Sequence, residues 1–224
     1  MNKIILLIIL SVMSTQCAQP GSKLTSTNQN ISILTLGDSY TIGSSVEIDH
    51  RWPIQLQSAI EKKHGIDVSL KIIAKSGWRT DDLRKAIIEE NITTKYDYVT
   101  LLIGVNNQYQ KKAISDYPQE FNKCIDQAIN FTQSLDNVIV ISIPDYAYTP
   151  FGQTKDPKRI SKEIDQYNDI NKRISIERGV KYVDITDITR IGLSDPALVA
   201  KDGLHPSGKC YSYFIPRILQ IMKL

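Results

Sequence analysis

A serine near the end of an apolar run is the first residue in this sequence whose position could support chemistry. Gly37, Asp38 and Ser39 directly follow the run, so a hydroxyl lies where a strand would end. A serine becomes a nucleophile when a nearby base takes its proton and a third group orients that base. Glycine, aspartate and serine are also common turn formers and helix caps, so this segment alone fits either a nucleophile or a turn.

Three histidines, His50, His64 and His205, are the candidates for the base. His64 follows two lysines and precedes a glycine, which is typical of a helix end, and His50 lies in a loop without an evident carboxylate partner in fixed geometry. Asp202 lies three residues before His205, so one short loop could supply both the base and its orienting carboxylate. The same segment also fits the entry turn of a helix that begins near Pro206. No second histidine or cysteine stands at zinc-ligand spacing, so no zinc site is expected.

Attack by a serine on a carbonyl also requires hydrogen-bond donors for the oxyanion that forms. Gly77 lies in a polar turn after a second apolar run, and a glycine allows the backbone to approach a substrate closely. Asn106 follows a third apolar run and offers a neutral side-chain amide. The candidate donors are therefore the N–H groups of Ser39 and Gly77 and the amide of Asn106. Taken singly, Gly77 also fits a simple turn, and Asn106 a strand-end cap.

Alternating apolar and amphipathic stretches indicate the elements that must position these residues. Short runs rich in isoleucine, valine and leucine predict strands, and stretches with an apolar period near 3.6 predict helices. The predicted strands are Ser32–Leu36, Val68–Ala74, Tyr98–Ile103, Val138–Ile143 and Lys181–Asp184; the predicted helices are Pro53–Lys63, Asp81–Glu90, Asp116–Leu135, Arg159–Arg178 and Ser207–Met222. This alternation predicts a mostly parallel five-stranded sheet covered on both faces, with ligands bound beyond the carboxyl ends of the strands.

Four segments in this order resemble the sequence blocks of the SGNH hydrolases, the GDSL-type lipases and esterases. The matching segments are Gly37-Asp38-Ser39, Gly77, Gly104-Val105-Asn106 and Asp202-Gly203-Leu204-His205-Pro206. The resemblance implies a flavodoxin-like three-layer α/β/α sandwich, ester substrates and a mechanism without a cofactor. It also implies that Ser39 is the nucleophile, His205 the base and Asp202 its orienting group, with oxyanion donors from Ser39, Gly77 and Asn106.

Two positions depart from the family pattern. Asn107 stands where the third block usually ends in aspartate, which leaves open how this loop is braced. Tyr40 replaces the leucine of the family's name, a change that we expect to be neutral. The G-x-S-x-G motif of the α/β-hydrolases is absent, and Asp202 and His205 lie closer together than the acid and histidine of that family, so that family is disfavoured.

The first residues have the pattern of an export signal. Lys3 precedes the nine-residue apolar run Ile4–Val12, which is too short to span a membrane but typical of a secretory signal. Cys17 resembles the acceptor of a bacterial lipoprotein signal, although Gln16 is bulkier than the small residue such signals prefer. We expect export to the periplasm or outer surface, with a lipid anchor at Cys17 left open. The predicted parts are a signal or lipoprotein-type export segment (1–17), a flexible tether (18–30) and one SGNH hydrolase domain (31–224).

Bulk composition restricts the class of partner. The chain has 224 residues, of which 42% are hydrophobic and 23% charged, as in a soluble domain with a substantial core. The formal net charge is +3 without a basic stripe, so nucleic acid is not an expected partner. Besides Cys17, only Cys124 and Cys210 remain, which leaves open whether they pair or stay as buried thiols.

These observations predict an exported serine esterase that acts on carboxylic esters, with acyl or acetyl groups on a small molecule or a glycan as substrate. The alternatives are an acyltransferase that uses the same site and a non-catalytic glycan-binding surface lipoprotein. The long aromatic segment Ile143–Arg159 could wall a pocket through Tyr146, Tyr148 and Phe151, or these side chains could simply pack in the core. Trp78 and Tyr109 carry the same ambiguity. Acyl-chain length and oligomeric state are not readable from the sequence.

Overall fold

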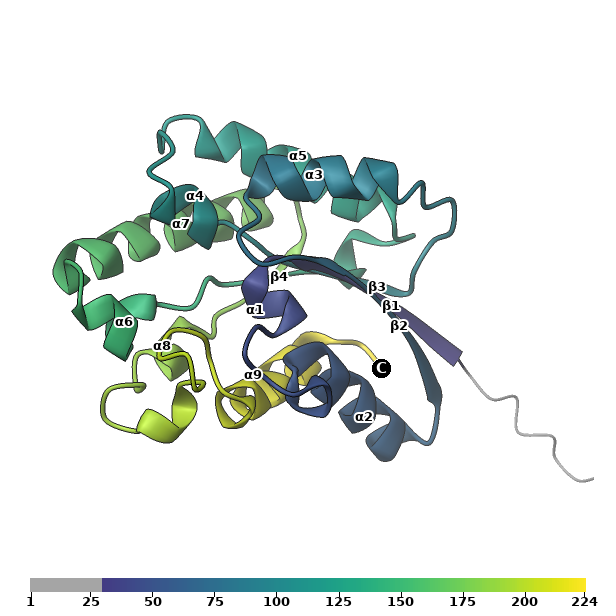
Figure 1. The fold of residues 1–224 in the computed structure, drawn as a ribbon. Helices are drawn as coiled ribbons and strands as arrows, with labels where there is room; N and C mark the ends of the chain where they lie inside the picture. Colours follow the sequence, from purple (N-terminus) through teal and green to yellow (C-terminus); the bar gives the residue numbers. More distant parts are fainter. Residues whose placement is uncertain (1–29) are drawn as a thin grey trace, which may run out of the picture.

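The predicted parallel sheet is confirmed by a computed structural model that describes residues 30–224 (Figure 1). The strands are β1 (Asn30–Gly37), β2 (Asp67–Ala74), β3 (Tyr98–Leu102), β4 (Val138–Ile141) and β5 (Lys181–Val183). All neighbours pair in parallel in the order β2-β1-β3-β4-β5, which is the flavodoxin-like order. Gly37 pairs with Ala74 and with Leu102, so β1, β2 and β3 end level with one another.

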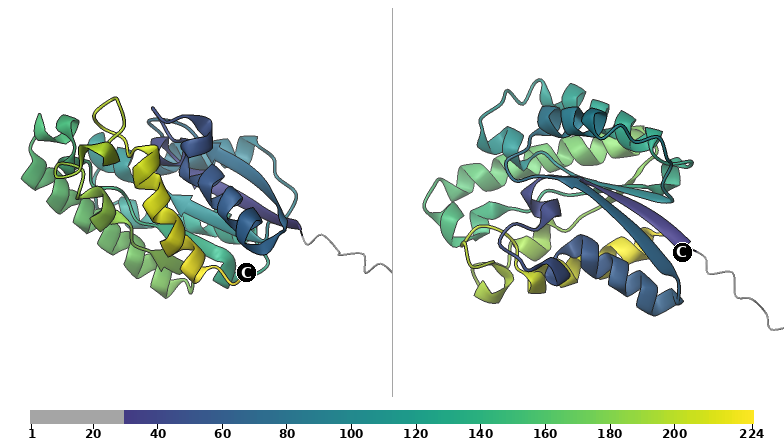
Figure 2. Two further views of the ribbon diagram at one scale, coloured as in Figure 1. Left: turned by 90° about the horizontal axis from the view of Figure 1, so that it is seen from below. Right: turned by 45° about the vertical axis from the view of Figure 1, so that its right-hand side comes forward.

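Helices cover both faces of this sheet and make the outer layers (Figures 1 and 2). One face carries α3 (Thr80–Glu89), α5 (Tyr117–Asn130) and α7 (Pro157–Glu177), and the other carries α2 (Trp52–His64) and α9 (Gly208–Ile221). Four short helices, α1 (Ser39–Ile42), α4 (Val105–Tyr109), α6 (Pro150–Gln153) and α8 (Thr186–Thr189), lie toward the carboxyl ends of the strands. The 3₁₀ turns are η1 (Ile48–His50), η2 (Leu135–Asn137), η3 (Tyr146–Tyr148) and η4 (Pro196–Leu198).

The core forms because the central strands are apolar on both faces. Every residue of β3 and β4 is buried, and helices pack on each side of them. In α5 the buried side chains recur at steps of three and four residues, so one stripe of the helix faces the sheet. Within residues 30–224 no helix is both long and apolar enough to cross a membrane.

Most predicted boundaries differ from the observed ones by one or two residues, and two of the differences have a clear physical cause. β1 begins at Asn30, a residue predicted to belong to the tether, because Asn30 pairs with Asp67 at the start of β2. The helix predicted to reach Leu135 ends at Asn130, because the carbonyl of Phe131 accepts a hydrogen bond from the N–H of Tyr96 instead of continuing the helix. The export segment and the rest of the tether lie outside the described residues.

Candidate active site

The nucleophile candidate lies at the junction of β1 and α1, over the carboxyl end of the sheet. Ser39 is the first residue of α1, and the Asp38 side chain caps this helix by accepting the Tyr40 N–H at 3.0 Å. Gly37 has to be small, because a Cβ there would lie 2.5 Å from the carbonyl oxygen of Leu102. The Gly-Asp-Ser segment is therefore both a turn and a helix cap, and these roles hold the serine at the edge of the sheet.

The base candidate and its carboxylate partner meet in the loop before α9. His205 Nδ1 lies 2.6 Å from Asp202 Oδ2, and Asp202 Oδ1 accepts the backbone N–H groups of Leu204 and His205, each at 3.0 Å. The positive φ of Gly203, 71°, allows the tight turn that brings both side chains together. Since an ionised carboxylate only accepts hydrogen bonds, His205 carries its proton on Nδ1 and leaves Nε2 free to accept one.

Asp202 is strongly held in its charged form. Its partial burial raises the pKa, but hydrogen bonds from His205, from the Ser45 hydroxyl and from two backbone N–H groups outweigh that effect. The pKa of the Asp202 carboxyl therefore lies well below its ordinary value. The Ser45 contact is 2.7 Å long and joins residues 157 positions apart. Asp202 therefore stays ionised at neutral pH, as a group that orients and stabilises a protonated histidine must.

One open cleft of about 300 Å³ contains the reactive atoms of both segments. Ser39, Gly77, Asn106 and His205 line it, with Asp202 behind His205. Ser39 Oγ makes no hydrogen bond with His205 among the described residues, and catalytic hydrogen bonds often shorten only when substrate binds. The Tyr40 ring packs edge-on against the His205 ring with centroids 5.7 Å apart, which restricts the orientation of the imidazole.

The three predicted oxyanion donors line the same cleft. Within residues 30–224 the backbone N–H groups of Ser39 and Gly77 have no hydrogen-bond partner. The Asn106 amide donates one N–H to the carbonyl of Trp78 at 3.0 Å, which orients the amide and leaves its second N–H unused. Gly77 has a φ of 86°, so the turn that exposes its N–H favours glycine.

Asn107, the departure from the family pattern, does brace the third block. Its Oδ1 accepts the Thr80 N–H at 3.1 Å, and its Nδ2 donates to the Thr80 hydroxyl at 2.8 Å. Thr80 is the first residue of α3, so this buried asparagine ties α4 to α3 next to the cleft. An amide suits the position because it accepts and donates at once.

Two supporting residues were not found from the sequence. Ser45 holds Asp202, and Gln110 donates to the Gly77 carbonyl at 3.0 Å while accepting from Arg79 at 2.6 Å. Both act on residues more than 30 positions away, so no local pattern identifies them. Ser45 does have an unusual φ of 63°, but this is a structural signal rather than a sequence signal.

Three aromatic side chains form one wall of the cleft, which we call the aromatic wall: Tyr109, Tyr146 and Phe151. Their ring centroids lie 6.1 to 6.5 Å apart, and the outermost ring, Tyr109, is 49% exposed. Tyr148 does not line the cleft and instead lies beneath the Arg190 guanidinium, while the Trp78 ring packs against the core. Of the five aromatic residues predicted either to line a pocket or to pack in the core, only the three of the aromatic wall line the cleft.

The described residues do not form a cluster of potential metal ligands. Among residues 30–224 no three histidine, cysteine, aspartate or glutamate side chains are grouped so that they could hold an ion.

Comparison with known proteins identifies the family to which this chain belongs. The model of the GDSL-like lipase/acylhydrolase family matches residues 35–212, and the chain belongs to that family. It is a carboxylic ester hydrolase. A curated relative, an acetylxylan esterase of Geobacillus stearothermophilus, is 30% identical over 162 residues, which cover 69% of this chain and 71% of that protein.

Solved structures show the same fold. An acetyl xylan esterase of Geobacillus stearothermophilus, Axe2-W215I, superposes with a TM-score of 0.68 at 19% identity and covers 85% of this chain and 94% of its own. A member of the lipolytic G-D-S-L family from Veillonella parvula gives a TM-score of 0.69 at 17% identity, with 86% and 99% covered. At these identities the structural likeness supports the fold alone.

Proposed function

We propose that this chain is a serine esterase that works through an acyl-enzyme on Ser39, with acetyl groups on carbohydrates as its substrate class. The observation that carries the proposal is the convergence of Ser39, the His205–Asp202 pair and three unused N–H donors in one cleft. The acetylxylan esterase relative supports an acetylated carbohydrate. The aromatic wall supports a ring-shaped alcohol portion, because aromatic faces offer a large apolar contact area.

The first half of the reaction forms the acyl-enzyme. Ser39 Oγ attacks the ester carbonyl carbon while His205 Nε2 takes the hydroxyl proton. The carbonyl oxygen becomes an oxyanion that accepts hydrogen bonds from the N–H groups of Ser39, Gly77 and Asn106, three residues that line the cleft. Asp202 keeps the proton on Nδ1 and stabilises the imidazolium. The C–O bond to the alcohol then breaks, and His205 gives its proton to the leaving oxygen.

The second half releases the acid. A water molecule takes the place of the alcohol, and His205 Nε2 removes its proton as its oxygen attacks the acyl carbon. The same three N–H donors stabilise the second oxyanion. Collapse of this intermediate returns the proton to Ser39 Oγ and frees the carboxylic acid.

Ser39→Ala tests this mechanism directly. On acetylated xylooligosaccharides the variant should fold normally and lose activity by roughly a million-fold, because it lacks the proposed nucleophile on which the acyl-enzyme forms. A phosphonate inhibitor should label wild-type Ser39, detected by peptide mass spectrometry. Ser212→Ala is the matched control, since the Ser212 hydroxyl bonds only the carbonyl of Lys209 in its own helix. Near wild-type turnover by folded Ser39→Ala would contradict the mechanism.

We also propose that the protein is exported and attached to a membrane by lipid on Cys17. The support is the sequence alone: an apolar run followed by this cysteine and a polar stretch. The full-length protein should partition into detergent, and Cys17→Ser should be released as a soluble exported form. Aqueous partitioning of the full-length wild-type protein would contradict the lipid anchor.

A further inference from the structure

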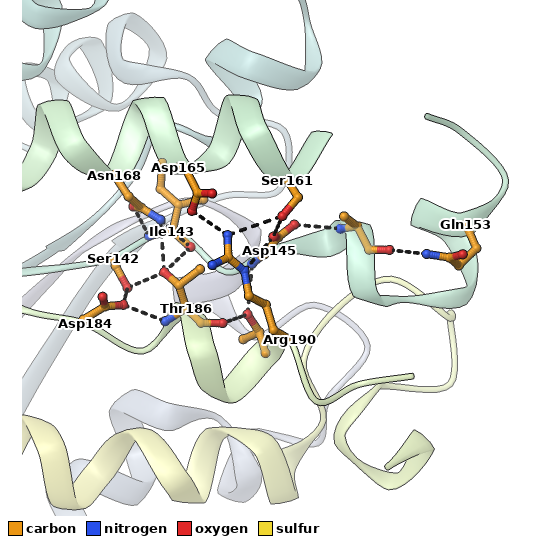
Figure 3. Close-up of polar contacts among 12 residues, drawn as sticks. Ser142, Ile143, Asp145, Gln153, Ser161, Asp165, Asn168, Asp184, Thr186 and Arg190 are labelled. Atoms are coloured by element: carbon orange, nitrogen blue, oxygen red, sulfur yellow. Dashed lines mark hydrogen bonds and ion pairs between the residues drawn. The ribbon is translucent and has the colours of Figure 1, made fainter. Parts of the chain in front are cut away.

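An ion pair joins the buried Asp145 carboxylate to the partly exposed Arg190 guanidinium, and neither residue lines the cleft (Figure 3). The Asp145 side chain is fully buried, and its Oδ2 accepts Arg190 Nε at 2.9 Å and the Ser161 hydroxyl at 2.5 Å. A second Arg190 nitrogen donates to Asp165 at 2.5 Å and to Ser161 at 3.3 Å. Burying a carboxylate is costly unless it is paired, so Arg190 is what makes this position of Asp145 tenable.

Asp145 uses its remaining groups to hold the turn η3. Its Oδ1 accepts the Ala147 N–H at 3.0 Å and so caps the turn. Its own backbone N–H donates to the Thr189 hydroxyl at 2.9 Å, in the helix that directly precedes Arg190. The start of η3 is therefore tied to α7 through Ser161 and to α8 through Thr189 and Arg190.

The first residue of η3 is Tyr146, one of the three rings of the aromatic wall. Tyr146 lines the cleft, and its hydroxyl donates to Gln108 at 2.9 Å. Gln108 in turn donates to Glu163 at 2.6 Å, so hydrogen bonds hold the far end of the ring as well as its backbone. Arg190 thus bonds Asp145, and Asp145 directly precedes Tyr146 and caps the turn that Tyr146 begins, although Arg190 itself does not line the cleft.

We propose that Arg190 is a positioning residue for substrate selection: through Asp145 it sets the place of Tyr146, and thereby how tightly the cleft binds the alcohol portion of the ester. The half-exposed Tyr109 puts the aromatic wall at the mouth of the cleft, where an alcohol portion extending toward solvent would contact it. This proposal rests on the proposed function for the reaction itself. It adds Arg190 as the residue that controls which alcohol portion the cleft binds. Bond cleavage itself depends on Ser39, His205 and the N–H donors, which Arg190 does not touch.

Arg190→Met tests this role by removing the guanidinium while keeping most of the stem. Two acetate esters are compared, ethyl acetate with a minimal alcohol and acetylated xylobiose with a ring that reaches the aromatic wall. The variant should raise KM for acetylated xylobiose about tenfold and change its kcat little, as expected when ground-state and transition-state binding are lost equally. The preference for acetylated xylobiose over ethyl acetate should fall by a similar factor.

A double-variant cycle separates positioning from general stability. If Arg190 acts through Tyr146, then Tyr146→Leu should reproduce the loss of selectivity, and the double variant should lose little more than either single variant. Arg173→Met is the control, because Arg173 forms a comparable pair with Glu177 on the exposed side of α7. Should Arg190→Met fail to fold, Arg190→Lys carries the same test, since lysine keeps the charge but loses the forked geometry.

The outcomes separate this proposal from the proposed function. Equal losses of kcat/KM on both esters would leave the preference unchanged and would overturn the positioning role. Fully additive effects of Arg190→Met and Tyr146→Leu would overturn it as well. Absence of acetate release by the wild-type protein from both esters would instead contradict the proposed function.

Discussion

Two adjacent asparagines show how a single residue's contacts decide its role. Asn106 uses one amide N–H to bond Trp78 and keeps the other in the cleft, while Asn107 commits its oxygen and one N–H to Thr80. The side chains are identical, so composition cannot separate them. Asn106 retains an N–H for the proposed oxyanion, whereas Asn107 holds α3 and α4 together.

Asn106→Ala should therefore lower kcat by roughly a hundred- to a thousandfold, about 3–4 kcal/mol of barrier, with little change in KM. The reason is that the amide meets a full negative charge only in the transition state, whereas the ground-state carbonyl accepts weakly. Steady-state kinetics and melting temperature are measured on one preparation, with Asn107→Ala as the contrast. Asn107→Ala should lower stability by about 1–3 kcal/mol, because it leaves the buried Thr80 N–H without a partner. A lower melting temperature with normal turnover in Asn106→Ala would show that Asn106 is only a cap.

At the scale of elements, the junction of β1 and α1 contains a buried carboxyl. Asp38 is fully buried, its Oδ1 caps α1, and its Oδ2 has no hydrogen-bond partner among the described residues. Burial raises the pKa of the Asp38 carboxyl from 3.8 to about 7, although the backbone N–H groups of Tyr40 and Asp38 itself lower it. The folded state therefore retains this proton over a range in which the unfolded chain has released it.

This retained proton makes stability fall as pH rises. Between about pH 4 and pH 7 the folded state binds more protons at Asp38 than the unfolded state does. The stability contributed by protonated Asp38 is therefore full below pH 4 and is lost as the pH rises to about 7. A shift of this size corresponds to at most about 4 kcal/mol. Asp38→Asn keeps the cap acceptor and cannot ionise. The free energy of unfolding of this variant, relative to that of the wild type, should therefore increase as the pH rises from 4 to 7. Denaturant unfolding from pH 4 to pH 8 measures the difference, and parallel curves for the two proteins would contradict the assignment.

At the scale of the whole molecule, the sheet separates the two cysteines of the described domain. Cys124 lies on α5 and Cys210 on α9, on opposite faces of the sheet, and both are free and buried (Figure 1). Burial raises the pKa of the Cys210 thiol to about 12 and raises the pKa of Cys124 further. Neither thiol can form the reactive thiolate, or reach the other, while the domain is folded.

Both thiols should consequently report global unfolding. In a Cys17→Ser background, a disulfide reagent should modify Cys124 and Cys210 only as fast as the domain opens, and a reductant should leave the melting temperature unchanged. Reaction is followed by mass spectrometry with increasing denaturant. Rapid modification of either thiol under native conditions would show that the layer covering it opens locally.

Features that depend on neighbouring residues can be predicted from the sequence alone. Strands buried on both faces produce continuous apolar runs, so β3 and β4 were predicted close to their observed positions. Asp202 and His205 lie three positions apart, and a tight turn brings such a pair together with little help from the rest of the fold. Parallel strands end at one edge, which is why Ser39, Gly77 and Asn106 were expected to meet.

Contacts between distant segments have no local sequence signal and become visible only in the folded domain. Ser45 reaches Asp202 across 157 positions and Arg190 reaches Asp145 across 45, and no local period encodes either pair. Tyr146 and Tyr148 are equally aromatic and two positions apart, yet the capped turn directs only Tyr146 into the cleft. The physical reason is that such contacts depend on how the layers pack, because each side chain's partners come from elements that are remote in the chain but adjacent in the folded domain.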